Sequence, residues 1–291
     1  MSTSYDVVVV GCGLMGSALA RTLAEHGHVV AAWNRTPGRA EALASSGVVP
    51  VRNLSEAVGS ASVVVACTST YETTREALRD VTGWTGTTLV NVGTGTPAEV
   101  DTMQQWTAER GVDYLDGSIL CYPQHIGTPE GMVLFSGPEE IWKRHEELLS
   151  AFGASVHVSA KPQAASVLDV ALAGGFYVTA LAAYAEAVTF AGNHGISADE
   201  LTGVTEAIVE LLRVMTPELA RSIETGEHET DQATVEVYAA GLAACLAAMR
   251  ATGQEPAVLA AATQRLAAAE AAGAGHLGFS AIAEYGTQTP A

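Results

Sequence analysis

Short apolar runs alternate with amphipathic stretches along the first half of the chain. Residues 7–10 form a continuous β-branched run, which is typical of a parallel strand buried on both faces. A glycine-rich turn, a helical stretch and a second apolar strand follow before residue 36. The alternation continues, with strand-like segments at 62–67, 88–92, 112–115, 132–135 and 155–158 and helical segments at 72–80 and 139–152. The pattern predicts a doubly wound α/β sheet.

The pattern changes at about Gln163, after which no strand-like alternation remains. Over the next ~30 residues only Asp169 and Glu186 are charged, which predicts one helix of about 45 Å. The stretch between these acids is shorter than the ~20 residues that cross a bilayer, and no basic residues flank it. We therefore expect a buried helix. Small residues along it would let another backbone approach closely: Ala171, Ala173, Gly174, Gly175, Ala180, Ala182, Ala183 and Ala187.

Helical stretches at 198–225, 234–251 and 255–272 make the second half all-helical. A small helical domain with an apolar spine gains its missing core from a partner, so we expect a dimerisation surface there. The chain is predicted to contain an α/β domain at 1–161, a long interdomain helix at 162–192, and a helical domain for dimerisation and substrate binding at 193–291.

The first predicted strand runs into the spacing G-x-G-x-x-G, formed by Gly11, Gly13 and Gly16. The first glycine permits a tight turn, the second lets the backbone approach a pyrophosphate, and the third lets the helix pack closely on the strand. Leu14 and Met15 lie inside the motif, where N–H groups at the helix start face the anion. Because a helix and a second strand follow, the motif predicts a Rossmann dinucleotide site; the alternative is a glycine turn that binds nothing.

The residues after the second strand distinguish NAD from NADP. An enzyme that uses NAD usually has Asp or Glu there for the ribose 2′-OH, whereas a 2′-phosphate needs a cation. This chain has Asn34, Arg35 and Thr36, with Arg39 one turn further on. A guanidinium and a neutral hydroxyl suit a phosphate monoester, which a carboxylate would repel. The sequence therefore favours NADP, the alternative being that Arg35 is a solvated loop charge.

In a doubly wound sheet the ligand binds at the carboxyl ends of the strands. The loops after residues 67 and 92 should then face the cofactor, which places Cys67, Thr68, Ser69 and Thr94 beside it.

Composition excludes some classes of partner. A net charge of −18 argues against nucleic acid or an anionic membrane as a partner. The four cysteines have no metal-ligand or C-x-x-C spacing and are typical of reduced thiols in the cytosol. The eight histidines show no ligand pairing, so we expect no metal site. The N-terminal MSTSYDVV has no signal-peptide pattern, and we expect a cytoplasmic protein.

Several motifs together resemble one enzyme family. VVGCGLMG, WNRT, VNVGTGTP, LDGSILCYPQHIGTPEGMVLFSG and LDVALAGGFY occur in an order similar to that of imine reductases and reductive aminases, which are relatives of the β-hydroxyacid dehydrogenases. The match spans almost the whole chain. The resemblance implies a Rossmann domain, a long interdomain helix and a helical domain that interlocks with a second subunit as a domain-swapped homodimer. It also implies NADPH as cofactor, and an imine, or a ketone plus an amine, as substrate.

The charge at the start of the long helix bears on the reaction. β-Hydroxyacid dehydrogenases have a lysine there to support the oxygen anion that forms on carbonyl reduction. The only lysines of this chain are Lys143 and Lys161, and by the resemblance Asp169 takes the position. A carboxylate stabilises an iminium cation and opposes a developing alkoxide, so the exchange favours C=N over C=O.

The resemblance also implies roles for individual residues. Tyr177 matches the proposed proton donor or substrate anchor, and Asp169 assists it. The two lie at i and i+8 on one predicted ridge of an α-helix. From the residues alone, Tyr177 would be a core tyrosine and Asp169 a surface or paired acid. Members proficient in ketone–amine condensation have an Asn and a Gln where this chain has Thr94 and Tyr238. Those two residues, with Tyr122 and Ile208, are expected to line the substrate pocket.

Two further functions stay open at this point. One is a β-hydroxyacid or other carbonyl dehydrogenase that uses NADP, for which Asp116 and Gly117 occupy the place of the substrate loop. The other is a non-catalytic NADP-binding protein.

Overall fold

The computed structural model describes residues 4–84 and 86–286. The chain divides into two compact units, one up to Phe176 and one from Tyr177 onward. The division therefore falls inside the predicted interdomain helix.

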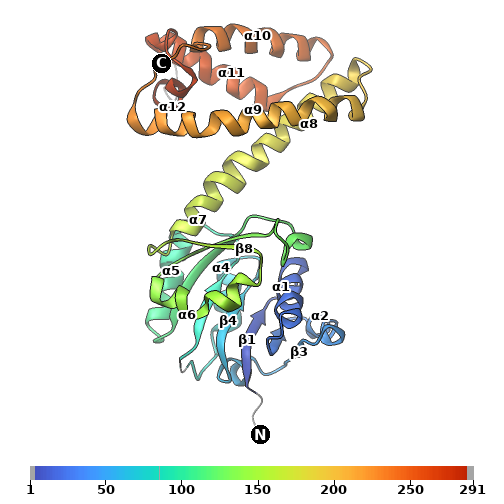
Figure 1. The fold of residues 1–291 in the computed structure, drawn as a ribbon, viewed down its shortest axis with the longest axis vertical. Helices are drawn as coiled ribbons and strands as arrows, with labels where there is room; N and C mark the ends of the chain where they lie inside the picture. Colours follow the sequence, from blue (N-terminus) through green and yellow to red (C-terminus); the bar gives the residue numbers. More distant parts are fainter. Residues whose placement is uncertain (1–3, 85, 287–291) are drawn as a thin grey trace. The chain divides into compact units, whose positions relative to one another are not determined.

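The first unit is built on one eight-stranded sheet with the strand order β3-β2-β1-β4-β5-β6-β7-β8 (Figure 1). Among the strands that the structure describes, β6 and β7 run antiparallel and the other neighbouring pairs run parallel. The strands are β1 Tyr5–Val10, β2 Val30–Trp33, β3 Val49–Pro50, β4 Ala61–Ala66, β5 Thr88–Asn91, β6 Asp113–Ile119, β7 Met132–Ser136 and β8 Ala154–Ser159. The predicted doubly wound α/β sheet is confirmed.

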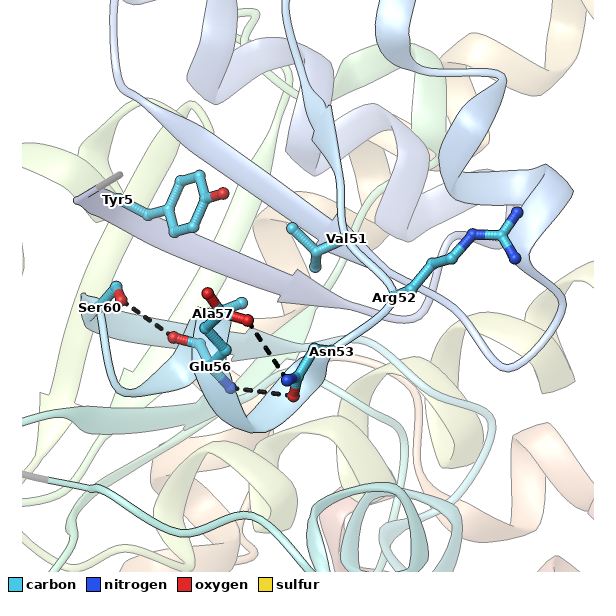
Figure 2. Close-up of a pocket in the computed structure, with 7 residues that line it drawn as sticks. All are labelled: Tyr5, Val51, Arg52, Asn53, Glu56, Ala57 and Ser60. Atoms are coloured by element: carbon cyan, nitrogen blue, oxygen red, sulfur yellow. Dashed lines mark hydrogen bonds between the residues drawn. The ribbon is translucent and has the colours of Figure 1, made fainter. Parts of the chain in front are cut away.

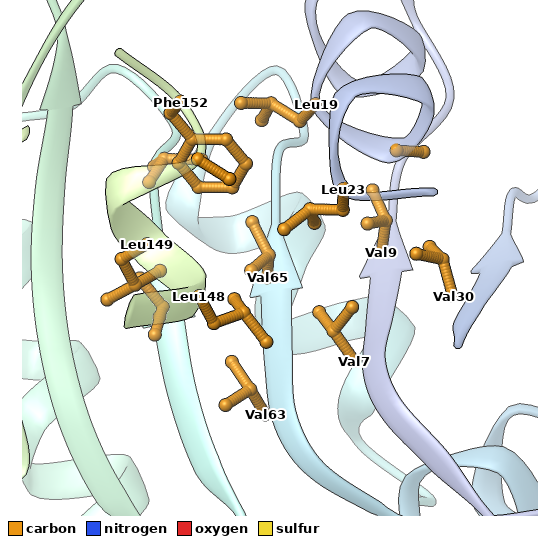
Figure 3. Close-up of a cluster of buried hydrophobic side chains, with 14 of the residues drawn as sticks. Val7, Val9, Leu19, Leu23, Val30, Val63, Val65, Leu148, Leu149 and Phe152 are labelled. Atoms are coloured by element: carbon orange, nitrogen blue, oxygen red, sulfur yellow. The ribbon is translucent and has the colours of Figure 1, made fainter. Parts of the chain in front are cut away.

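Helices cover both faces of this sheet. They are α1 Leu14–Glu25, α2 Pro37–Glu41, α3 Leu54–Val58, α4 Tyr71–Leu78, α5 Pro97–Ala108 and α6 Glu139–Ser150, with the 3₁₀ turns η1 Ala44–Ser46 and η2 Pro123–His125. Side chains alternate along β1, so that Val7 and Val9 pack into one core and Val8 and Val10 into the other. Figure 3 shows the first core, in which Val7 and Val9 face Leu19 and Leu23 of α1, Leu148 and Leu149 at the end of α6, and Phe152 just beyond that helix. Each fully buried side chain contributes about 1.5–3 kcal/mol.

The predicted long helix forms as one helical run, Ala164–Asn193. It consists of α7 Ala164–Leu168, the π-helical segment η3 Asp169–Val178 and α8 Thr179–Asn193. The expectation that this helix is buried is wrong for the single chain, since Leu172 and Val178 are 48% and 58% exposed. The described part of the chain leaves most of its apolar side chains uncovered. By length and mean hydropathy (1.6) the run resembles a membrane span, but a single helix of this kind is weak evidence for one, because core helices of soluble proteins pass the same test.

The second unit is helical, as predicted. After α8 come α9 Ala198–Thr225, α10 Val235–Ala251 and α11 Ala257–Ala269, then the π-helical η4 Glu270–Ala274, the 3₁₀ turn η5 Phe279–Ala281 and α12 Ile282–Tyr285. Its core is small and consists of Val235, Ala239, Leu266, Ala269, Ala274 and Ala281. Large apolar side chains of α9 face outward instead, among them Val204 and Val209, at 61% and 58% exposed. Such a surface is typical of a subunit interface.

Two polar contacts join the helices of the second unit. The Glu186 carboxylate of α8 accepts hydrogen bonds from the backbone N–H groups of Val258 (2.8 Å) and Leu259 (3.2 Å), and so caps the start of α11. Buried His228 makes contacts of 2.9 Å with Ser280 Oγ and 3.3 Å with the Glu284 carboxylate, which link the turn after α9 to η5 and α12.

Candidate functional site

The glycine-rich turn between β1 and α1 requires glycine on steric grounds. Gly11 has φ +101°, and a Cβ there would lie 2.3 Å from the Cys67 carbonyl oxygen. A Cβ on Gly16 would lie 1.9 Å from the Gly11 carbonyl oxygen. Gly13 is the exposed N-cap of α1, and a Cβ there would meet nothing within 4 Å among the described residues. The turn therefore packs tightly on the protein side and is open at the helix N-terminus, as a phosphate cradle must be.

Asn34 connects this turn to the end of β2. Its Oδ1 accepts a hydrogen bond from the Cys12 backbone N–H (2.9 Å), while its Nδ2 donates to the Thr36 carbonyl (3.0 Å). Burial raises the pKa of the Cys12 thiol to about 11, and the positive charge of Arg39 opposes this, so Arg39 acts on the glycine turn. Arg35, Thr36 and Arg39 are all exposed. The two guanidinium groups are therefore accessible to an anion beside the turn.

A pocket of about 250 Å³ lies at the carboxyl ends of β4 and β5. Five residues predicted from the sequence line it, namely Met15, Cys67, Thr68, Ser69 and Thr94. Val92, Gly93, Ser118 and Ile119, which the prediction did not include, complete the wall. Burial raises the pKa of the Cys67 thiol to about 12, so this wall is uncharged at neutral pH. The position at the strand ends is where α/β sheets of this kind bind ligands.

A second pocket of about 180 Å³ lies elsewhere on the first unit (Figure 2). Tyr5 at the start of β1 contributes to it, together with the segment that leads into α3 and α3 itself. Figure 2 shows Asn53 bonded to Glu56, which is the ordinary N-cap of α3. None of the predicted site residues lines this pocket, and it has no glycine turn.

The remaining predicted residues of the first unit lie on separate elements. Leu14 opens α1 and is 85% exposed, so its backbone rather than its side chain belongs to the turn. Tyr122 precedes η2 and makes an edge contact with His125, with ring centroids 6.0 Å apart. Asp169 begins η3 and is half-buried.

In the second unit, Tyr177 is half-exposed and Ile208 is exposed on α9. Tyr238 on α10 packs edge-on against Phe279, with ring centroids 5.0 Å apart. The prediction that Asp169 and Tyr177 share one ridge of an α-helix is wrong, because residues 169–178 are π-helical. Bonding from i to i+5 widens each turn, so residues four apart no longer stack as they do in an α-helix.

A buried acid lies beneath the pocket. The prediction that placed Asp116 in a substrate loop is wrong, because the residue lies within β6 and is 0% exposed. Its Oδ1 accepts hydrogen bonds from the Tyr71 hydroxyl (2.6 Å) and the Tyr114 hydroxyl (2.7 Å). Burial raises the pKa of Asp116 to about 7; the two phenols oppose the rise and the nearby Asp169 charge adds to it. Gly117 is also in the strand, where a Cβ would lie 2.9 Å from Val92.

Within residues 4–84 and 86–286, no three His, Cys, Asp or Glu side chains form a group that could hold a metal ion.

Two family profiles match the chain in succession. The NAD binding domain of 6-phosphogluconate dehydrogenase matches residues 6–160, which is more than half of the chain. The C-terminal domain of NADPH-dependent reductive aminase-like proteins matches residues 161–288. The chain belongs to the imine reductase and reductive aminase family.

Individual members of the family are similar along most of their length. An imine reductase from Pseudomonas sp. has a solved structure with a TM-score of 0.91 and 29% identity, covering 97% of this chain and 99% of that one. A reductive aminase from Aspergillus terreus, solved in complex with NADPH and ethyl levulinate, gives a TM-score of 0.91 at 25% identity and the same coverage. The NADPH-dependent reductive aminase of Aspergillus oryzae is 28% identical over 82% of each chain.

Proposed function

We propose that this protein is an NADPH-dependent imine reductase, which transfers a hydride to the carbon of a C=N bond. One observation carries the proposal: in a member of this family, a sterically tight glycine turn borders a pocket at the strand ends, and two exposed arginines follow the neighbouring strand β2. The imine reductase and reductive aminase relatives support it, since one is solved with NADPH and a ketone. Reductive amination of a ketone with an amine would extend the same chemistry, because it passes through an imine.

The glycine turn fits the pyrophosphate of NADPH, because a Cβ would fill the space that Gly11 and Gly16 leave to the backbone. We assign the N–H groups from Gly13 to Gly16, including those of Leu14 and Met15, to the diphosphate. We assign the 2′-phosphate to Arg35, Thr36 and Arg39, with Asn34 holding the turn. Cys67, Thr68, Ser69 and Thr94 form the wall beside the nicotinamide ring.

NADPH, when bound, supplies the hydride. The protein must then stabilise a cationic C=N group and deliver a proton to its nitrogen. We assign the first role to the Asp169 carboxylate and the second to the Tyr177 hydroxyl. The substrate pocket is assigned to Thr94, Tyr122, Ile208 and Tyr238.

The positions of the two lysines disfavour carbonyl reduction as the main activity. Lys143 is exposed on α6 and forms an ion pair with Glu139 (2.6 Å), and Lys161 is exposed beyond β8. Neither lines the pocket at the strand ends. An alkoxide that formed there would have no lysine to stabilise it, whereas an iminium ion needs none.

The apolar faces of η3, α8 and α9 support a homodimer, in which a second copy of this chain buries them. We propose the interlocked, domain-swapped form, with an α/β domain at 1–161, a connecting helix at 162–192 and a dimerisation domain at 193–291. In this dimer the second subunit, and not a membrane, would cover the exposed apolar side chains of the helix Ala164–Asn193. The negative charge disfavours nucleic acid as a partner, and we propose a cytoplasmic location.

The experiment that tests the proposal follows NADPH absorbance with 1-pyrroline and 2-methylpyrroline as substrates, then with a ketone and excess amine. We expect oxidation of NADPH with the cyclic imines. Turnover of hydroxy acids with NADP, together with no reaction toward any imine, would establish the carbonyl dehydrogenase instead. Tight NADPH binding with no turnover at all would indicate a non-catalytic binding protein.

A further inference from the structure

Buried polar side chains form a layer directly beneath the pocket. Asn91 ends β5 and precedes the pocket residues Val92–Thr94, and Asp116 lies two residues before the pocket residue Ser118. Tyr71 and Thr74 belong to α4, which follows the pocket residues Thr68 and Ser69. The layer therefore connects the three segments that make most of the pocket wall.

At the two strands β5 and β6, the layer contains two polar atoms without a hydrogen bond. Asn91 and Asp116 are register partners on β5 and β6, so their side chains emerge on the same face of the sheet. Among the described residues, neither Asn91 Nδ2 nor Asp116 Oδ2 forms a hydrogen bond of good geometry, although both are buried. The Asn91 amide approaches the Tyr71 hydroxyl closely enough to oppose the rise in the pKa of Tyr71 that burial causes. A buried polar atom without a partner costs about 1–3 kcal/mol, so the arrangement calls for a reason.

Between Asn91 and the pocket, the layer consists of a chain of threonine hydroxyl groups. Thr74 Oγ1 lies 3.1 Å from Asn91 Oδ1 and 2.7 Å from Thr68 Oγ1, and Thr68 Oγ1 lies 2.9 Å from the Thr70 carbonyl. Each threonine has one proton to donate, so the chain has a direction. In one direction Thr68 donates to Thr74, which donates to Asn91 Oδ1. In the other, the Asn91 amide is turned over, its Nδ2 donates to Thr74, and Thr68 donates to the Thr70 carbonyl.

Each direction suits one arrangement around the acid. Asn91 and Asp116 share no hydrogen bond in the structure, but an ionised Asp116, which only accepts hydrogen bonds, would attract Asn91 Nδ2. Asn91 Oδ1 would then be left for Thr74, and Thr68 would donate to Thr74. Neutral Asp116 carries an O–H group that needs an acceptor, so Asn91 presents Oδ1 to it and Nδ2 to Thr74. We propose that Asp116 is a positioning residue of the cofactor pocket, whose protonation sets the direction of the hydrogen bonds through Asn91 and Thr74 to Thr68. With Asp116 neutral, Thr68 bonds to the Thr70 carbonyl and holds this part of the pocket wall in place.

The groups around Asp116 determine the pH range of this exchange. Tyr71 from α4 and Tyr114 from β6 donate to it, and Asp169 from η3 repels its negative form. Glu99 of α5 acts on Tyr71, while β5 and β7 present Asn91 and Ser136, which do not titrate. Because burial raises the pKa of Asp116 to about 7, the acid is neutral below that pH and ionised above it. The pocket wall is therefore held at acidic pH and loosened as the pH rises.

The test measures the Kd for NADPH of the full chain by cofactor fluorescence between about pH 6 and pH 8. This test rests on the proposed function, because it requires that the pocket binds NADPH. As the pH rises from about 6 to about 8, we expect the affinity of the wild type for NADPH to fall about fivefold more than the affinity of Asp116→Asn. The amide of this variant stays neutral and donates a hydrogen bond as the protonated acid does. Thr74→Val interrupts the chain but leaves Asp116 in place, and should also show the flatter profile. Tyr114→Phe removes a donor to the carboxylate and should move the midpoint upward.

Equal pH profiles for the wild type and Asp116→Asn would overturn the proposal, and so would a wild-type profile in Thr74→Val. If the protein binds no NADPH, the proposed function fails, and hydrogen exchange over residues 67–74 then tests the positioning role by itself. That comparison supports the role if wild-type protection falls above about pH 7, relative to Asp116→Asn, and refutes it if the two proteins stay alike.

Discussion

In the proposed cofactor site, selectivity between dinucleotides depends on single side chains. Asn34 uses both ends of its amide to connect the glycine turn to the end of β2, and leaves the adjacent arginines exposed. An Asp or Glu at this point would repel a 2′-phosphate, whereas a guanidinium attracts it and gains little from a free 2′-OH. Selectivity for NADPH over NADH should therefore depend on Arg35 and Arg39.

Replacing Arg35 tests this directly. Arg35→Ala should weaken NADPH binding by about 10–100-fold and NADH binding little, because a charge-assisted phosphate contact is worth about 1.5–3 kcal/mol. The measurement is the Kd for each cofactor by fluorescence titration. Arg52→Ala is the matched control, since Arg52 is also exposed but pairs with Glu41 (2.8 Å) beside the second pocket. An equal loss for both cofactors would show that Arg35 does not contact the 2′-phosphate.

The proposed role of the Tyr177 hydroxyl as proton donor can be tested separately from cofactor binding. Tyr177→Phe should lower kcat about 100-fold with little change in the Kd for NADPH, because proton delivery by a positioned group contributes about 10²–10⁴ in rate. Tyr184→Phe serves as the control, since its hydroxyl contacts Thr205 (3.0 Å) on the neighbouring helix α9. Steady-state rates with 1-pyrroline measure the effect, and an unchanged kcat would exclude Tyr177 as the donor.

Some helices and strands could be predicted from the sequence better than others. The strands with continuous β-branched runs were predicted because burial on both faces leaves a clear pattern in the sequence. β3 was not predicted, because two residues, Val49–Pro50, are too few for any period. The π-helical form of η3 was also missed, since α- and π-helices share the same apolar composition and differ only in hydrogen-bond pairing.

The candidate site divides in the same way. Gly11, Gly16 and the residues after β4 and β5 were predicted, because their spacing is fixed by the turn and by the strand ends. Ser118 and Ile119 were missed, because the predicted strand ended at residue 115, whereas β6 continues to Ile119 and brings both residues to the pocket. The burial of Asp116 was missed as well, since its partner Tyr71 is 45 residues away in the sequence.

At the level of one helix, Glu186 replaces the missing cap of α11. That helix begins after Pro256 with no side-chain cap of its own. Glu186→Ala should lower the free energy of unfolding by about 1–2 kcal/mol, and Glu186→Gln by less, because the amide oxygen still accepts a hydrogen bond. Chemical denaturation measures this, with Glu206→Ala on the exposed surface of α9 as the control. No difference between Glu186→Ala and the control would show that α11 is stable without this cap.

At the scale of the whole molecule, the apolar side chains of α9 test the proposed assembly. Val209 is 58% exposed in the single chain, and Val209→Asp would put a charge into the dimer interface. We expect the variant to sediment as a monomer in analytical ultracentrifugation and to lose most of its activity. Val49→Asp on the edge strand β3 changes the charge by the same amount and should leave the dimer intact. If Val209→Asp also sediments as a dimer, α9 is not the interface.

The small core of the second unit also affects how the protein responds to dilution. Six buried side chains, most of them alanine, contribute little hydrophobic free energy compared with the area that η3, α8 and α9 leave exposed. If a second copy supplies that burial, folding of this unit and association are one equilibrium, and the melting temperature should rise with protein concentration. Dilution alone would then inactivate the protein by unfolding the helices, even while the α/β unit keeps its structure.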